Sequence, residues 1–149
     1  LKNGKIKNVR FVDCDLANCK FEQTLMENVE FIKCRMTGFK AIDCKLQTIL
    51  FDHSQMKLAQ FRMNTFKKSV FDHCLLEEAD FYGSTLSGTL FTESNLMKAE
   101  MSGTKLVDTD FRSSSIAGLK VSIESLKGAI INPGQVNDLA WLLGAKIIY

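Results

Sequence analysis

The sequence predicts an all-β repeat protein in which the chain winds into stacked, four-sided coils of twenty residues and ends in a short capping helix. Three observations support this prediction. A large apolar residue recurs at every fifth position over most of the chain. A small residue stands two positions before almost every one of them. After Ile131 the period stops, and a helix-capping sequence follows.

The length and composition fit one globular domain. The chain has 149 residues, of which 46% are apolar and 24% charged, and its 19 Lys and Arg against 17 Asp and Glu give a formal charge of +2. This balance argues against a disordered tail and against a strongly basic nucleic-acid module. No apolar run approaches the roughly 18 residues that a membrane span needs, so we expect a cytoplasmic protein without a membrane segment. Because the first residue is Leu1 and not Met, the alternative that a leader peptide has been removed is left open.

The period of five is clearest in the phenylalanines. All but one of the 11 Phe occupy positions that leave the same remainder when divided by five. Every position in that phase from Ile6 to Leu126 is apolar, which is neither the 3.6-residue stripe of a helix nor the alternation of a half-buried strand. We infer that the chain turns a corner every five residues, so that four corners close a coil of twenty.

When the large apolar residues that lie twenty positions apart are grouped together, they form four columns. This grouping predicts a core of four ladders, in which neighbouring residues of one ladder are about 4.8 Å apart. Ala41 interrupts one column, but Phe39, in the small position beside it, is the one Phe out of phase. The two positions therefore look exchanged, which keeps the local volume roughly constant. Another column consists of phenylalanine alone: Phe11, Phe31, Phe51, Phe71, Phe91 and Phe111.

The five cysteines all occupy the small position, where Ser, Ala and Thr alternate with them. We therefore interpret them as small buried thiols in a reducing compartment rather than as a disulfide framework or a zinc site. A fortuitous disulfide between Cys14 and Cys34 is left open, because these two residues stack one coil apart. The cysteines are Cys14, Cys19, Cys34, Cys44 and Cys74.

These repeats resemble the pentapeptide-repeat family, whose loose consensus is a small residue, Asp or Asn, a central Leu or Phe, and two variable polar residues. The resemblance covers about residues 4–131. It implies a right-handed quadrilateral parallel β-solenoid. The residues themselves indicate about six coils over residues 1–131, followed by a C-terminal helix and short strand over residues 132–149. The closest matches are Ala79-Asp80-Phe81, Ser94-Asn95-Leu96, Cys14-Asp15-Leu16 and Thr109-Asp110-Phe111.

The C-terminal region carries the signals of a helix that covers the last coil. Asn132 is a predicted N-cap, Pro133 the first helical residue and Gln135 the partner in a capping box, so we expect a helix from about Pro133 to Leu143 that stops at Gly144. One stripe at helical spacing should seal the solenoid, as an open end requires. That stripe consists of Val136, Leu139, Ala140 and Leu143.

A second apolar surface lies outside that stripe, on the helix and on a short apolar strand that should follow it. We hypothesise that this surface forms a two-fold dimer, end to end, as the resemblance to the Qnr/MfpA-like quinolone-resistance group also implies. The expected dimerisation residues are Trp141, Leu142, Ile147, Ile148 and Tyr149.

The outward positions beside the Phe column are a candidate partner-binding surface. Each coil contributes an acid there, and three apolar residues stack among them. A continuous apolar strip beside acids suggests a contact surface, although edge positions of a solenoid also tolerate apolar residues. The candidate residues are Asp13, Glu30, Leu50, Asp52, Val70, Asp72, Leu90, Glu93 and Asp110.

We expect no catalytic, cofactor or metal site. The sequence has no nucleophile beside a base and no Gly-rich phosphate loop, and a convex rod offers no cleft for either. Asp52-His53 and Asp72-His73 recur one coil apart. We interpret them as solvated surface residues, with a weak metal site or a pH-sensitive site as the alternative.

The resemblance implies a non-enzymatic protein that binds DNA gyrase or topoisomerase IV by imitating duplex DNA and so reduces quinolone susceptibility. The formal charge of +2 argues against this hypothesis, because a DNA mimic needs a dense negative potential. The alternative is a structural or scaffolding protein with an unrelated protein partner. Direct nucleic-acid binding is not expected, since the basic residues form no stripe.

Overall fold

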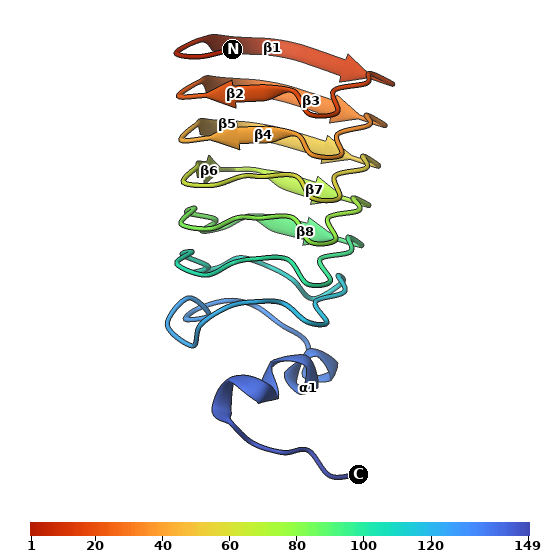
Figure 1. Cartoon of the computed structure of the whole chain (residues 1–149), viewed down its shortest axis with the longest axis vertical. Coiled ribbons are helices and arrows are strands. Elements are labelled where there is room, and N and C mark those ends of the chain that lie inside the picture. Colours follow the sequence, from red (N-terminus) through yellow and green to blue (C-terminus); the bar gives the residue numbers. More distant parts are fainter.

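The computed structural model describes residues 1–149 as a parallel β-solenoid that ends in a short helical segment (Figure 1). The coils stack along one axis, and the helical segment and the C-terminus lie at one end of the stack. None of the helices combines the length and the apolar character that crossing a membrane requires. The strands are β1 (Lys5–Val12), β2 (Lys20–Glu22), β3 (Leu25–Ile32), β4 (Lys40–Ile42), β5 (Lys45–Asp52), β6 (Thr65–Lys67), β7 (Val70–Asp72) and β8 (Leu90–Thr92).

The register between coils confirms the twenty-residue period. All strand pairs are parallel, and the larger sheet has the order β1-β3-β5-β7-β8, with β6 also paired to β5. Each residue pairs with the one twenty positions later, as Phe11 does with Phe31 and Phe51 with Phe71. Isolated bridges keep the same offset up to the pair of Asp110 and Ile130.

The part of the solenoid that is built from strands is slightly shorter than expected, at about four turns rather than six coils. Beyond Thr92 the coils continue through single bridges instead of strands. From Phe81 onward most corners are closed by a β-turn, such as that in which the Ser84 N–H donates to the Phe81 carbonyl at 3.0 Å. Successive turns leave too few extended residues between them for a strand.

A left-handed backbone conformation recurs in the coils with the same period of five. It falls on the second residue after a central apolar residue, and both Asn8 (φ 55°) and Gly88 (φ 75°) adopt it. Most occupants are not glycine, and Thr48 (φ 54°) is even β-branched. Each coil therefore depends on a conformation that L-residues adopt at a cost.

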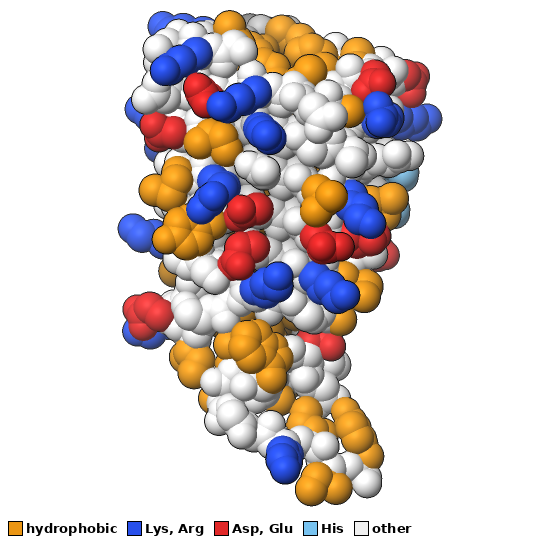
Figure 2. All heavy atoms as spheres, viewed as in Figure 1, with side chains coloured by type: hydrophobic (Ala, Val, Ile, Leu, Met, Phe, Trp, Pro, Cys, Tyr) orange, Lys and Arg blue, Asp and Glu red, His pale blue; other side chains and the backbone are white.

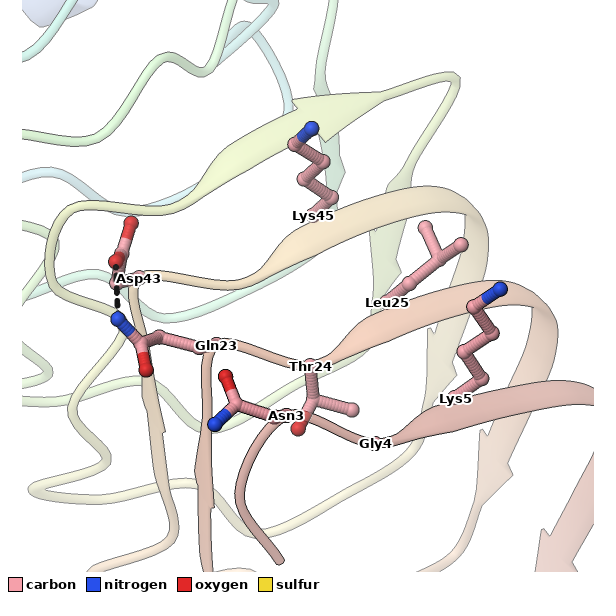
Figure 3. Close-up of a pocket in the computed structure, with 8 residues that line it drawn as sticks. All are labelled: Asn3, Gly4, Lys5, Gln23, Thr24, Leu25, Asp43 and Lys45. Atoms are coloured by element: carbon pink, nitrogen blue, oxygen red, sulfur yellow. Dashed lines mark hydrogen bonds between the residues drawn. The ribbon is translucent and has the colours of Figure 1, made fainter.

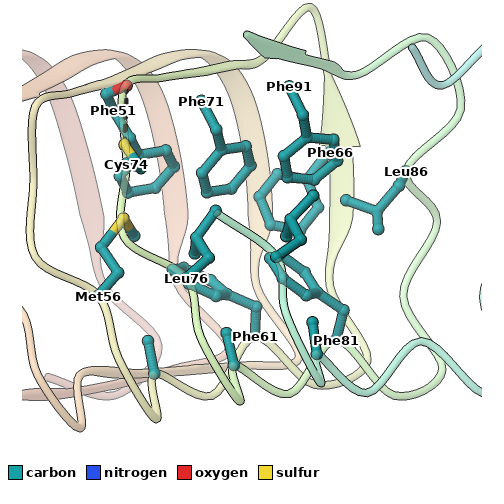
Figure 4. Packing of buried hydrophobic residues seen from close by; sticks show 14 of the residues in the cluster. Phe51, Met56, Phe61, Phe66, Phe71, Cys74, Leu76, Phe81, Leu86 and Phe91 are labelled. Atoms are coloured by element: carbon teal, nitrogen blue, oxygen red, sulfur yellow. Dashed lines mark hydrogen bonds between the residues drawn. The ribbon is translucent and has the colours of Figure 1, made fainter. Parts of the chain in front are cut away.

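The four-column core is present as predicted (Figure 4). The rings of the Phe column stack with centroids 4.5–5.3 Å apart and planes within 14° of parallel. Phe61 meets the Phe71 ring edge-on at 5.9 Å and 83°, an arrangement that aromatic pairs favour. Phe11 in the first coil is only partly buried, because no coil precedes it in the described residues.

Phe39 and Ala41 have exchanged roles, which confirms the interpretation of their positions. Phe39 is buried, and its ring centroid lies 5.4 Å from that of Phe21 and 6.0 Å from that of Phe61. The ring of Phe39 thus fills the gap that Ala41 leaves in its column.

The small inward position is polar as well as small because its side chain bonds to the backbone of the preceding coil. Ser54 Oγ donates to the Phe31 carbonyl at 3.3 Å, and Ser94 Oγ donates to the Phe71 carbonyl at 3.1 Å. Cys74 Sγ makes the same contact with the Phe51 carbonyl at 3.3 Å. Ser and Cys are therefore interchangeable here, whereas Thr89 Oγ1, at the same repeat position, is buried without a hydrogen-bond partner.

The predicted capping box is present. Asn132 Oδ1 accepts from the Gln135 N–H at 3.0 Å, and Gln135 Oε1 accepts from the Asn132 N–H at 2.9 Å. The helical run has the expected limits and ends at Gly144 with φ 68°, but only its centre is α-helical. It consists of η1 (Pro133–Gln135), α1 (Val136–Leu139) and η2 (Ala140–Leu143).

The stripe expected to seal the last coil is correct for Leu139 but wrong for Val136 and Leu143. Val136 is 53% exposed and Leu143 is 75% exposed, whereas Leu139 is buried and Leu142 packs against the core. Gln135 fixes this orientation, since its buried Nε2 donates to the carbonyls of Phe111 at 2.7 Å and Ser114 at 2.8 Å.

The short strand expected at residues 147–149 is also absent. These residues form no β-structure, and the last bridge of the solenoid already involves Ile130. An isolated apolar segment without a neighbouring strand edge has no partner for its backbone.

Candidate partner-binding surface

The outward residues in the position before and the two positions after each member of the Phe column form a surface that we call the Phe face. The parallel register arranges these residues in columns along the rod. The first column, immediately before each Phe, holds Arg10, Glu30, Leu50, Val70, Leu90 and Asp110.

The nine residues predicted for partner binding all lie on the Phe face, but their acids do not form a single line. Glu30 and Asp110 stand at the two ends of the apolar part of the first column. Asp52 and Asp72 pair with each other in a second column. Asp13 and Glu93 belong to a third, in which His53 and His73 lie between them. The acidic potential is therefore spread across the face.

Basic side chains offset much of this acidity. Arg10 Nε lies 2.6 Å from Glu30 Oε2, and Arg112 Nη2 lies 2.8 Å from Asp110 Oδ2. Hydrogen bonds from Arg112 hold the pKa of the Asp110 carboxyl below its usual value. The twenty-residue offset between Arg10 and Glu30 could have indicated their pairing from the sequence.

The apolar strip consists of Leu50, Val70 and Leu90, which pair with one another in the first column. Leu50 and Val70 are half-buried, and Leu90 is 39% exposed. Leu75 occupies the same repeat position on the neighbouring side of the rod and is 48% exposed, but it pairs with Gln55 and Asn95. A single leucine at this repeat position is therefore tolerated on another side of the rod. A continuous strip of three apolar residues at this position is found only on the Phe face.

The side of the rod that precedes the Phe face is rich in lysine, as its sequence indicates. An open recess of about 480 Å³ near the N-terminus is lined there by Lys5 and Lys45 (Figure 3). Its other wall is polar, and Gln23 Nε2 donates to Asp43 Oδ2 at 3.5 Å. The recess is lined by eight residues of which one is hydrophobic, and it brings no nucleophile next to a base.

The C-terminal residues predicted for dimerisation differ in exposure. Trp141 is 53% exposed, Ile148 is 88% exposed and Tyr149 is 98% exposed, and Ile147 is also exposed. Leu142 instead packs against the core, and Leu143 takes its place on the outer surface. Apolar side chains accordingly gather at the C-terminal end of the rod (Figure 2).

The cysteines are all free thiols, and none belongs to a group of three or more potential metal ligands. Cys34, Cys44 and Cys74 are buried in the core. Burial raises the pKa of all three, that of Cys74 to about 12. A thiol held in its protonated form is a poor nucleophile.

Comparison with known proteins identifies the repeat. The family model for pentapeptide repeats matches eight copies over residues 10–47 and 65–112. Similar solved structures include the pentapeptide-repeat protein Rfr23 from the cyanobacterium Cyanothece 51142, at 9% identity, 88% coverage of this chain, 90% of that chain and a TM-score of 0.45. Trypsin-treated QnrB1 R167E, a plasmid-mediated fluoroquinolone resistance protein, matches at 15% identity, 99% coverage of both chains and a TM-score of 0.39.

HetL from the cyanobacterium Nostoc sp. strain PCC 7120, a pentapeptide-repeat protein involved in heterocyst differentiation regulation, matches at 10% identity with a TM-score of 0.23. The likeness covers 82% of this chain and 74% of that chain. No curated protein sequence matches. Since the family model covers more than half of the chain, the chain belongs to the pentapeptide-repeat family.

Proposed function

We propose that this protein is a non-enzymatic repeat rod that binds a protein partner on its Phe face. The observation that carries the proposal is the strip of Leu50, Val70 and Leu90, which presents apolar side chains in register on a sheet. The backbone of each coil is fixed by hydrogen bonds to its neighbours, so the strip is preorganised and little conformational entropy is lost on binding.

The surroundings of the strip define the chemistry of the partner. Glu30 and Asp110 end the strip, and Asp52 and Asp72 run alongside it. Arg10 and Arg112 already pair with Glu30 and Asp110. A complementary surface is therefore apolar at its centre and basic opposite Asp52 and Asp72, which favours specificity and rapid encounter.

The finer proposal names DNA gyrase or topoisomerase IV as the partner, with reduced quinolone susceptibility as the consequence. It is supported by the sequence resemblance to the Qnr/MfpA-like group and by the unbroken register from Lys2 to Ile130. Six coils spaced about 4.8 Å apart make a rod of about 29 Å. The formal charge of +2 and the ion-paired acids favour contact through one face over imitation of DNA charge on all sides.

A supercoiling assay with purified gyrase, with and without ciprofloxacin, tests this partner. We expect micromolar protein to inhibit supercoiling or to protect gyrase from the drug. Leu90→Asn should weaken this effect about tenfold, because it interrupts the strip with a residue that the same repeat position accepts at Asn95.

Leu75→Asn is the matched control, since it makes the same change at the same repeat position outside the Phe face. It should leave the effect on gyrase unchanged. Equal losses in the two variants would contradict the Phe face as the docking surface. If the wild-type protein neither inhibits nor protects gyrase, the topoisomerase proposal fails, and the scaffolding alternative with an unrelated partner remains.

The proposal also includes a homodimer through the exposed C-terminal residues Trp141, Ile147, Ile148 and Tyr149. They lie beyond the last coil, so an end-to-end dimer leaves the Phe face of each subunit free.

A further inference from the structure

Two Asp–His pairs stack one above the other on the Phe face. Asp52 Oδ1 lies 2.5 Å from His53 Nδ1, and Asp72 Oδ1 lies 2.7 Å from His73 Nδ1. The two imidazole rings are parallel within 4°, with centroids 4.5 Å apart. Both side chains are about half exposed, at 52% and 49%, and they are the two histidines of the chain.

The aspartates determine which ring nitrogen of each histidine carries a proton. An ionised carboxylate only accepts hydrogen bonds, so Nδ1 of His53 and of His73 must donate. A neutral ring then has its free lone pair on Nε2. Because the rings are parallel and bonded alike, their two Nε2 atoms face away from the aspartates in neighbouring parallel planes. Histidines that bind metal ions are oriented by carboxylates in the same way.

The local charge also favours a cation. Asp52 and Asp72 pair in the strand register, so their two carboxylates lie one coil apart beside the rings. Two negative charges next to the ring nitrogens favour a divalent cation there. Of the neighbours in the histidine column, Lys33 precedes His53 and Glu93 follows His73, and these two charges oppose each other.

We infer that His53 and His73 form a surface site for a divalent transition-metal ion, such as Zn²⁺ or Ni²⁺, through their Nε2 atoms. Imidazole nitrogens favour these ions over Mg²⁺ and Ca²⁺. With metal–nitrogen distances of about 2.1 Å, two ligands of one ion are at most about 4.2 Å apart. The lone pair of each Nε2 lies in the plane of its ring, so the two parallel rings must tilt toward each other to share one ion. Both side chains are half exposed, which leaves room for this rotation.

The site supplies two protein ligands, since no group of three metal-ligating side chains comes together on the chain. Its remaining coordination positions are open to water or to a donor from another molecule. The inference concerns the isolated chain, so it does not depend on the proposed gyrase partner.

Calorimetric titration of the reduced, tag-free protein with NiCl₂ at pH 7.5 tests the site. We expect one ion per chain, and a loss of affinity of more than tenfold in His73→Gln. Asp72→Asn keeps both ligands but removes the carboxylate that orients one of them, and should weaken binding about tenfold. Asp43→Asn is the matched control, because it removes the same charge from another side of the rod and should change affinity less than twofold.

A second measurement separates the histidines from the thiols. Nitrogen-15 NMR of the imidazoles should show the Nδ1–H tautomer in the free protein and a shift of Nε2 on addition of ZnCl₂. Binding that persists unchanged in the His53→Gln/His73→Gln double variant, or a wild-type protein that binds no ion at millimolar NiCl₂, would overturn the inference.

Discussion

At the scale of single residues, one backbone position in each pentapeptide sets the local strain. This position is left-handed in almost every repeat, and in one column along the rod it is occupied by Asn8, Asn28, Thr48, Lys68 and Gly88. Asn28 Nδ2 also donates to Asn8 Oδ1 at 2.7 Å, so asparagine contributes a bond between coils. Thr48 contributes none in the next coil and is β-branched, which makes the left-handed conformation costly.

Substitutions in this column should change stability in opposite directions. Gly88→Ala meets no atom within 4 Å, so its backbone conformation alone should lower the free energy of unfolding by about 1 kcal/mol. Thr48→Asn should raise it by about 0.5–1 kcal/mol, because it removes the β-branch and extends the asparagine ladder. Urea unfolding measures both changes. Thr37→Asn is the control, since Thr37 does not have a positive φ. A gain in Thr37→Asn as large as that in Thr48→Asn would contradict this account.

The buried thiol of Cys74 should make the fold sensitive to alkaline pH. An unfolded thiol ionises near its ordinary pKa of 9.0, whereas burial raises the pKa of Cys74 to about 12. The folded state therefore keeps a proton that the unfolded state loses. The stabilising contribution is complete below pH 9 and falls by about 1.4 kcal/mol per pH unit between pH 9 and 12.

Cys74→Ser removes this titration without changing the role of the position. Ser54 and Ser94 occupy the same place in the coils on either side and make the same bond to a backbone carbonyl. We expect urea unfolding of the variant to lose stability less steeply between pH 9 and 10.5 than the wild type does. Identical slopes would mean that the Cys74 thiol ionises as readily when folded as when unfolded.

At the scale of the elements, the columns could be predicted because each inward residue is identified by its own side chain. Phe39 was assigned correctly even out of phase, since its neighbour Ala41 is too small for its column. The backbone of the corners was not predictable in the same way. Whether a corner forms a strand or a β-turn depends on residues such as Gly83 and Gly103, which are variable surface positions in the repeat.

The C-terminal helix shows where a pattern of apolar residues is insufficient. Val136, Leu139 and Leu143 have helical spacing, but a neighbouring stripe of Gln135, Leu139 and Leu142 covers the last coil instead. The polar Gln135 favours this rotation of the helix, because its buried amide donates to the carbonyls of Phe111 and Ser114 in the last coil. The spacing of apolar residues alone could not predict this rotation, because the hydrogen bonds of Gln135 are made by a polar side chain.

The candidate surface was predicted in composition but not in arrangement. Leu50, Val70 and Leu90 form the strip that their twenty-residue spacing indicates. The acids divide into columns according to whether they precede or follow the central Phe, and side-chain rotamers then pair Asp110 with Arg112 and Asp72 with His73. Rotamers are set by the neighbouring coils, so the sequence alone does not determine these pairs.

At the scale of the whole molecule, the charges are mixed along the rod. Acidic and basic side chains alternate on the side visible in Figure 2. Lysines such as Lys45, Lys67 and Lys105 lie on the side that precedes the Phe face, where they contribute to the formal charge of +2. The sides of the rod therefore differ in charge, which fits the proposed docking through one face better than the uniform negative potential of a DNA mimic.

The apolar C-terminal end should determine the oligomeric state. Trp141 is 53% exposed beside the more exposed Leu143 and Ile148, a group of apolar side chains that a second copy can cover. We expect the wild type to sediment as a dimer at micromolar concentration and Trp141→Asp to sediment as a monomer, because the new carboxylate would be buried without a partner. Leu58→Asp, which changes a comparably exposed residue on the side of the rod, should remain dimeric. A wild-type protein that is already monomeric under these conditions would exclude the end-to-end dimer, while leaving the Phe face of each subunit available to its partner.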